Sequence, residues 1–172
     1  RAFREFLQGE GSTEIHTPKL GQAGAEGGSS QFRLDYFGRK AVLAQSPQLY
    51  KQAMVGVFER VYEIGPVFRA EKHATQRHLN EYTSLDLEMG FLHSFTDLMA
   101  LEQGFLRRLV ALLRQEYAGE LALLGAELPD AEHIPAVRFD EAKRLAAEAY
   151  GYAIREPYDL EPEEEQHIGR YA

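Results

Sequence analysis

Two segments of the sequence carry polar side chains at alternating positions. Arg69 and Glu71 are two residues apart in the first segment, and Tyr82, Asp86 and Glu88 in the second are separated by even numbers of residues. Both segments have residue types that suit extended chain, and alternate residues of a strand share a face, so we expect a polar floor on two neighbouring strands. Charges on a sheet face are costly to bury unless they are paired or meet a ligand. Two interpretations stay open here: a site for charged ligands, or a structural salt bridge of Arg69 with Asp86 or Glu88.

The nine residues between these segments form a basic loop. Residues 72–80 contain the cations Lys72 and Arg77, the histidines His73 and His78, and no acid, although the whole chain has a net charge of -8. This local reversal of sign suits a polyphosphate or the end of an RNA, whereas a solvated loop would need no ligand. The tyrosine that follows the loop could stack on a base or simply pack within its strand.

A third group of polar residues lies on a predicted helix. Ser46 can cap this helix with Pro47 at its first position, and Gln48 and Lys51 then share one face. On spacing alone this face is a solvated surface or part of a site. The glycine-rich stretch 21–30 is predicted to be a loop, and it is not a phosphate-binding loop because it lacks the Gly-Lys-Ser/Thr ending.

The composition excludes several classes of protein. A chain of 172 residues with 44% hydrophobic side chains can bury a sizeable core, so we expect one compact unit. Its acidic balance argues against a small basic nucleic-acid module. The absence of cysteine excludes disulfides and thiolate metal sites and fits a reducing cytoplasm, where we expect the protein to act. The six histidines form no zinc motif, and no apolar run is long enough to span a membrane.

Helices and strands are both expected along the chain. Strands are predicted at 13–17, ending at Pro18, in a hairpin of 32–36 and 41–44, over 61–71 with a break at Gly65-Pro66, and over 81–92. Besides the helix at Pro47, helices are predicted over 1–8, from a capping box at Ser94 to a C-cap at Gly119, and from Asp140 to Gly151, followed by an acidic surface segment over 156–165.

Several of these segments together resemble one enzyme family. Residues 67–71, the nine-residue loop and residues 81–89 resemble motif 2 of class II aminoacyl-tRNA synthetases, and residues 77–81 narrow this to the aspartyl and asparaginyl subgroup, which 138–142 also fits. Residues 14–18 are similar to the end of motif 1. Residues 45–52 resemble the aspartyl enzymes, because asparaginyl enzymes typically lack Lys51 and carry Glu-Pro-Glu in place of 86–88. The loop has the form of the archaeal-type aspartyl branch.

The resemblance implies a fold and an organisation. It implies an α+β fold with an antiparallel sheet flanked by helices, in which residues 1–172 are the N-terminal part of a catalytic domain with motifs 1 and 2. Motif 3 and most Mg²⁺ ligands are then expected downstream of Ala172, and an anticodon-binding barrel upstream of Arg1. No metal ligand is assigned within the chain. Motif 1 implies a homodimer, and the family implies ATP, aspartate and tRNA as ligands, with no membrane.

The resemblance also implies roles for individual residues. Arg69 would be the catalytic cation between the substrate α-carboxylate and the ATP α-phosphate. The other aspartate-binding residues would be Gln48 and Asp86 at the α-amino group, Lys51 at the side-chain carboxylate and Glu26 closing over the substrate. The other ATP-binding residues would be Tyr82 stacking on adenine, Arg77 and His78 near the pyrophosphate, and Glu71 near adenine or the tRNA terminus. Alternatives are an asparaginyl-tRNA synthetase, or a synthetase-like paralogue that makes asparagine or binds a regulator without charging tRNA.

Overall fold

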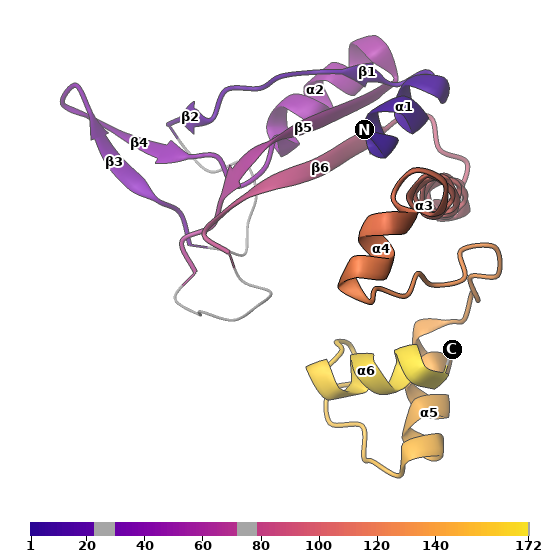
Figure 1. Cartoon of the computed structure of the whole chain (residues 1–172). Helices are drawn as coiled ribbons and strands as arrows, with labels where there is room; N and C mark the ends of the chain where they lie inside the picture. Colours follow the sequence, from indigo (N-terminus) through magenta and orange to yellow (C-terminus); the bar gives the residue numbers. More distant parts are fainter. Residues whose placement is uncertain (23–29, 72–78, 172) are drawn as a thin grey trace. The chain divides into compact units, whose positions relative to one another are not determined.

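The chain forms two compact units, Arg1–Leu128 and Pro129–Ala172 (Figure 1). The computed structural model describes residues 1–22, 30–71 and 79–171. The composition had led us to expect one compact unit, and the division arises because the last two helices pack on each other and enclose buried charges of their own.

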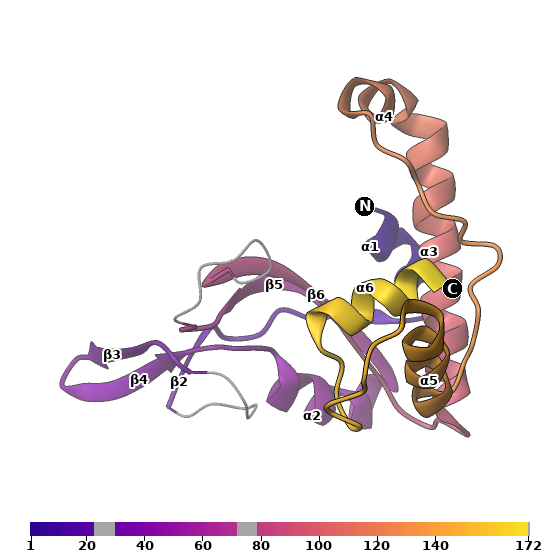
Figure 2. The same ribbon diagram turned by 90° about the horizontal axis from the view of Figure 1, so that it is seen from below.

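The first unit combines helices with two small sheets (Figures 1 and 2). Its elements, in chain order, are α1 (Ala2–Gly9), β1 (Thr13–Glu14), β2 (Leu20–Gly21), β3 (Arg33–Tyr36), β4 (Arg39–Leu43), α2 (Gln48–Phe58), β5 (Arg60–Phe68), β6 (Glu81–Met89), α3 (Phe95–Glu116) and α4 (Ala118–Leu124). One sheet has the order β1-β5-β6 and the other the order β2-β4-β3. The α+β class is therefore confirmed, with two sheets in place of one.

The β5–β6 hairpin is the central feature of the first sheet. The two strands pair antiparallel along their whole length, from Arg60 opposite Met89 to Phe68 opposite Glu81. The sheet is not purely antiparallel, because β1 pairs parallel to β5 with Thr13 opposite Val61. The second sheet is the predicted β3–β4 hairpin with β2 added antiparallel to β4.

One face of the first sheet carries the apolar core. Alternation along β5 and β6 directs one set of apolar side chains toward helices α1 and α3. The members of this core are Phe3, Leu7, Tyr62 and Leu101, with Phe6, Ile64, Leu87, Met89 and Phe105 packed against them. The rings of Phe3 and Tyr62 meet edge to face with centroids 5.8 Å apart, the geometry that aromatic quadrupoles favour.

Helix α2 contacts both strands of the hairpin. It buries Lys51, and Val55 lies one turn further along. A Cβ atom on Gly90 would lie 2.7 Å from Val55 Cγ1, so the chain just after β6 approaches the helix too closely for a side chain. The interpretation of the Gln48 and Lys51 face as solvated is wrong for Lys51, which is only 5% exposed.

Strand β5 runs through Gly65-Pro66 without the predicted break. The Tyr62 carbonyl accepts from Ile15 N and Phe68 N donates to the Ala44 carbonyl, so the even-numbered residues of β5 direct their backbone polar groups away from β6. Pro66 shares this parity, and its missing N–H therefore removes no hydrogen bond to β6. The strands also end earlier than predicted, at Phe68 and Met89.

The helix boundaries differ from prediction at the start of α2 and at the end of α3. Helix α2 begins at Gln48, one residue after Pro47, although Ser46 Oγ accepts from Gln48 N as a cap would. Gly119 is not a C-cap, because α3 ends at Glu116 and the left-handed residue that terminates α4 is Gly125. The capping box at Ser94 is confirmed. None of the helices among the described residues is long and apolar enough to cross a membrane.

The second unit is built on a buried ion pair. It consists of α5 (Phe139–Tyr150) and α6 (Pro162–Tyr171). Helix α5 begins one residue before Asp140, its predicted cap, and Gly151 caps its C-terminal end. Lys143 Nζ lies 2.8 Å from Glu164 Oε2, with both side chains almost fully buried. The predicted acidic surface segment is therefore wrong at Glu164, because the buried lysine requires a carboxylate partner.

Candidate active site

The face of the hairpin opposite the core carries a row of polar side chains. In the antiparallel register Asp86 lies opposite Glu63, Ser84 opposite Gly65 and Tyr82 opposite Val67, and directly opposed residues share a face. Tyr82, Ser84, Asp86 and Glu88 follow one another at two-residue spacing, so β6 presents all four on this face. The predicted polar floor is present, and it lies on the side of the hairpin that contacts α2.

Lys51 connects helix α2 to this floor. Its Nζ lies 2.8 Å from Asp86 Oδ1, 3.3 Å from the Leu87 carbonyl oxygen and 3.6 Å from Glu88 Oε2. Gln48, one turn earlier on α2, reaches the same carboxylate with its Nε2 3.5 Å from Glu88 Oε2. Helix α2 thus places an amide and an ammonium group over two carboxylates, a suitable arrangement for a ligand that bears both an ammonium group and a carboxylate.

Ser84 completes the surroundings of Asp86. Its hydroxyl donates to Asp86 Oδ2, while Lys51 binds the other carboxylate oxygen. The proposed salt bridge of Arg69 with Asp86 or Glu88 does not form among the described residues, because Lys51 occupies that role.

Arg69 lies at the other end of the floor, beyond the end of β5. Its guanidinium carbon is 6.0 Å from the centroid of the Tyr82 ring, which places the cation over the aromatic face. Within the part of the chain that the structure describes, Arg69 Nε is buried and has no hydrogen-bond partner. A buried donor left unpaired is costly, and an anionic ligand would satisfy it.

Asn80 holds the backbone around Arg69. The Arg69 amide donates to the Asn80 carbonyl at 2.9 Å, which extends the ladder one pair beyond β5. The Asn80 side chain, oriented to satisfy its hydrogen bonds, donates to the carbonyls of Arg69 and Glu71 at 3.1 Å each. Arg69 and Glu71 lie beyond the end of β5, and the side chain of Asn80, the residue just before β6, positions their backbone.

Sequence reasoning missed a second lysine–carboxylate pair on the same floor. Glu63, 3% exposed, binds Lys19 Nζ at 2.8 Å and accepts hydrogen bonds from the amide and hydroxyl of Thr17 at 2.9 and 2.7 Å. Burial raises the pKa of the Glu63 carboxyl, but the hydrogen bonds from Lys19 and Thr17 outweigh it, and the pKa lies below its ordinary value. Glu63 lies six residues before Arg69, so the two-residue period of the strand, followed back from Arg69, would have placed Glu63 on the same face.

The structure places the predicted site residues unevenly. It brings Gln48, Lys51 and Asp86 together, and Arg69 next to Tyr82. Glu71 lies three residues beyond the end of β5. The remaining predicted site residues, Glu26, Arg77 and His78, lie outside the described residues. Among the residues that are described, no group of three or more histidine or acidic side chains is suited to hold a metal ion.

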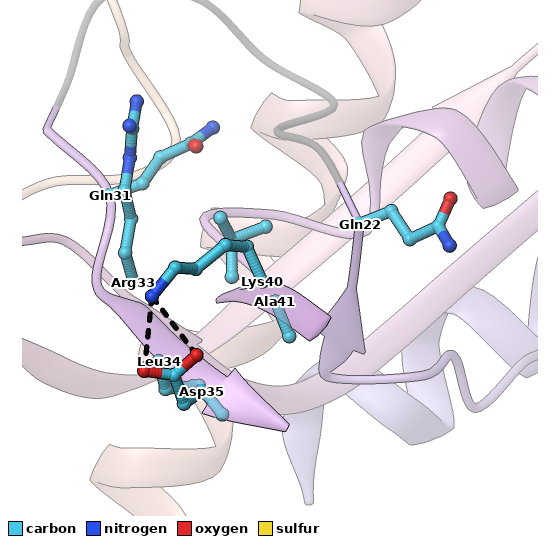
Figure 3. Close-up of a pocket in the computed structure, with 8 residues that line it drawn as sticks. Gln22, Gln31, Arg33, Leu34, Asp35, Lys40 and Ala41 are labelled. Carbon is cyan, nitrogen blue, oxygen red and sulfur yellow. Dashed lines mark hydrogen bonds and ion pairs between the residues drawn. The ribbon is translucent and has the colours of Figure 1, made fainter. Parts of the chain in front are cut away.

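A separate cavity of about 540 Å³ lies along the β3–β4 hairpin (Figure 3). Within it Lys40 Nζ lies 3.0 Å from each carboxylate oxygen of Asp35, and both side chains are largely exposed. Gln31 Nε2 donates to Gln45 Oε1 at 3.1 Å and so connects this cavity to the chain that leads into α2. The cavity contains none of the residues that α2 and β6 bring together, and its exposed ion pair is a weak basis for a site.

The fold and the site together define a class of enzyme. An antiparallel hairpin with a polar floor, a cation beyond its first strand and a lysine-bearing helix over the floor match the arrangement that motif 2 implies. A family model described as "tRNA synthetases class II (D, K and N)" matches residues 1–171. The chain belongs to this family.

Particular relatives are closer still. The chain is 53% identical over 171 residues to the Aspartate--tRNA(Asp/Asn) ligase of Deinococcus radiodurans, covering 99% of the chain and 39% of the relative. It is 51% identical over 173 residues to the protein of the same name from Thermus thermophilus, covering 100% of the chain and 40% of the relative. The chain thus spans about two fifths of the length of the curated relatives it matches.

Solved structures confirm the fold. The structure is similar to asparaginyl-tRNA synthetase from Pyrococcus horikoshii complexed with asparaginyl-adenylate, with a TM-score of 0.85, 31% identity and coverage of 99% of this chain and 40% of that one. It is also similar to aspartyl-tRNA synthetase from Entamoeba histolytica, with a TM-score of 0.76, 31% identity and coverage of 99% and 32%.

Proposed function

We propose that the protein carrying this chain activates aspartate with ATP and transfers the aspartyl group to tRNA. The observation that carries the proposal is the buried Lys51 ammonium on the polar floor, beside Asp86 and Glu88. A point charge in a closed site favours the side-chain carboxylate of aspartate over the neutral amide of asparagine, which would leave the charge poorly compensated. The names of the most similar relatives support the same amino acid.

In this proposal the floor holds the amino acid by both of its ends. Lys51 binds the side-chain carboxylate, while Gln48 and Asp86 bind the α-amino group. When aspartate binds, Lys51 can turn from Asp86 to the side-chain carboxylate of the substrate, and Asp86 can then pair with the substrate ammonium group. Each of the four charged groups keeps a partner of opposite charge. Glu26 closes over the substrate from the glycine-rich segment.

Arg69 serves the chemical step. An oxygen of the aspartate α-carboxylate attacks the α-phosphorus of ATP, the bond to the bridging oxygen of the β-phosphate breaks, and pyrophosphate leaves. Both reacting groups are anionic, so their mutual repulsion is the main obstacle, and a guanidinium between them lowers it. Arg69 Nε is buried and has no partner among the described residues, which supports this role. A terminal ribose hydroxyl of tRNA then attacks the activated carbonyl carbon, and AMP leaves.

The remaining residues would bind ATP. Tyr82 stacks on the adenine, Glu71 lies near the adenine or the tRNA terminus, and Arg77 and His78 face the pyrophosphate. Mg²⁺ would neutralise the phosphates of ATP, and we assign it no ligand in this chain. The segment from Ile15 to Pro18, part of motif 1, would lie at the two-fold interface of a homodimer.

The two relatives described above favour two tRNA acceptors. Both are named as ligases for tRNA(Asp/Asn), so we propose that tRNA(Asn) is charged with aspartate as well as tRNA(Asp). The structural likeness to an asparaginyl enzyme raises asparagine as a second candidate substrate. Lys51 and the Asp86-Leu87-Glu88 sequence argue against it.

The test is ATP–pyrophosphate exchange with aspartate and asparagine in parallel, followed by charging of both tRNAs. We expect exchange with aspartate and charging of both acceptors. Exchange with asparagine alone would contradict the proposal, and exchange with aspartate without any charging would identify a synthetase-like paralogue.

A further inference from the structure

The Lys19–Glu63 pair joins strand β5 to the segment between β1 and β2, which we call the crossing segment. Glu63 lies on β5, while Thr17 and Lys19 belong to the segment that leaves β1 and continues into β2. The carboxylate takes three hydrogen bonds from this segment, and Lys19 Nζ also donates to the Thr17 hydroxyl at 3.1 Å. Charge-assisted bonds at a buried carboxylate are among the stronger polar contacts in proteins, so the crossing segment is tied to the floor at this point.

The crossing segment in turn holds the chain that leads into α2. The Lys19 carbonyl accepts a hydrogen bond from Ala44 N at 3.0 Å, and the Ala44 carbonyl accepts one from Phe68 N at 2.9 Å. Leu20, the next residue, pairs with Leu43 on β4. Ala44 thus joins the two sheets through its own backbone. Helix α2 begins four residues later and carries Gln48 and Lys51 to the floor.

The pair also lies next to the amino-acid side of the site. Glu63 is directly opposite Asp86 in the β5–β6 register, so its carboxylate is the neighbour of the one that Lys51 binds. A Cβ atom on Gly65 would be 3.2 Å from Glu63 Oε1 and 3.4 Å from Lys19 Nζ, so this glycine leaves room for the pair.

We propose that Glu63 is a positioning residue for the amino-acid side of the active site. Through Thr17 and Lys19 it holds the crossing segment, through Ala44 that segment holds the start of α2, and α2 sets where Gln48 and Lys51 meet the substrate. Glu63 itself touches no reacting atom. The expected kinetic effects rest on the proposed function. The contacts from Glu63 through the crossing segment to Ala44 do not depend on it.

The kinetic test compares Glu63→Ala, Glu63→Gln and Glu63→Gln combined with Lys19→Met. We expect Glu63→Ala to raise KM for aspartate about tenfold while KM for ATP changes less than about twofold. Glu63→Gln keeps an acceptor for Thr17 but leaves the half-buried Lys19 ammonium without a countercharge. Adding Lys19→Met should therefore recover part of the loss. Glu148→Gln, at an exposed pair in the second unit, is the matched control.

A second measurement separates this inference from the proposed function. In the protein carrying this chain the Ala44 amide should exchange its hydrogen about tenfold faster in Glu63→Ala, with amides of α3 unchanged. This arm needs no catalytic activity, so it decides the inference even if the protein does not activate aspartate. Unchanged exchange at Ala44, or equal rises in KM for aspartate and ATP, would overturn the proposal.

Discussion

Glu63 and Asp86 face each other across the β5–β6 ladder, and each carboxylate has a lysine of its own. Lys19 Nζ lies 2.8 Å from Glu63 Oε1, and Lys51 Nζ lies 2.8 Å from Asp86 Oδ1. Two neighbouring carboxylates would repel each other if both were ionised without compensation. The two lysines come from different elements, so the charge balance of the floor depends on the correct packing of the crossing segment and of α2.

Replacement of Lys51 should abolish recognition of the substrate side chain. In the protein carrying this chain, Lys51→Leu should lower aspartate-dependent pyrophosphate exchange about 100-fold or more, because the substrate carboxylate loses its countercharge. Lys40→Leu, which removes an exposed lysine paired with Asp35, should have little effect and serves as the control. Retained exchange in Lys51→Leu would refute the assignment of aspartate to this floor.

Replacement of Arg69 should act on the chemical step. We expect Arg69→Gln to lower kcat for exchange about 100-fold or more, because the guanidinium no longer lies between two anions. The control is Arg144→Gln, which changes an exposed arginine in the second unit. A variant that kept kcat and raised only KM would show that Arg69 binds the ground state and contributes nothing specific to the transition state.

The ion pair between α1 and β1 should make stability depend on pH. Hydrogen bonds from Arg4 hold the pKa of Glu14 at about 2, below its ordinary 4.5, so the pair stabilises the fold above pH 4.5 and is lost as pH falls toward 2. Glu14→Gln should lower the free energy of unfolding at pH 7 by about 1 kcal/mol. Urea denaturation at several pH values checks this, and a difference that did not narrow below pH 4.5 would be evidence against it.

The second unit should depend on its buried pair. Lys143→Met leaves the Glu164 carboxylate without its countercharge and should destabilise the unit by about 3 kcal/mol. Combining it with Glu164→Leu removes both charges and should restore part of that loss. Hydrogen exchange across α5 and α6 is the measurement, with Arg144→Met as the exposed control. If the loss of unfolding free energy in the double variant equals the sum of the losses in Lys143→Met and Glu164→Leu, the two charges are not coupled.

The protein carrying this chain should be a homodimer. If residues Ile15 to Pro18 lie at the two-fold interface, an aspartate introduced at Ile15 would appear twice in that interface and weaken it. Sedimentation at micromolar concentration should show a dimer for the parent protein and a shift toward monomer for Ile15→Asp. A monomeric parent would exclude this role for motif 1.

Local patterns predicted the strands of the floor well. The alternation of Tyr82, Asp86 and Glu88 identified the polar face, because a two-residue period is visible in the sequence itself. The role of Glu63 could not be predicted in the same way, because its partners lie 44 and 46 positions away. The same reason applies to Glu164. Its acidic neighbours predicted an exposed segment, but Glu164 is buried against Lys143 of α5, a residue distant in the sequence.

Helix boundaries failed where two signals competed. Gly119 looks like a stop signal, yet the chain starts a new helix at Ala118 and ends it at Gly125, where a left-handed residue is needed. Pro66 looks like a strand breaker. Whether a proline interrupts a strand depends on whether its nitrogen faces the hydrogen-bonded partner strand, and the nitrogen of Pro66 faces away from β6. This direction depends on pairing with Ala44 and Ile15, which short-range patterns do not contain.

The absence of a side chain at Gly90 determines how closely α2 can pack on the β5–β6 hairpin. A methyl group there would lie 2.7 Å from Val55 Cγ1, and a branched valine cannot swing aside, so α2 would have to lift away from the hairpin. Lys51 is one helical turn from Val55 and would be carried off the carboxylates with it. The packing of α2 on the floor is therefore constrained at Gly90, because one hydrogen atom acts as the spacer between the helix and the chain that follows β6.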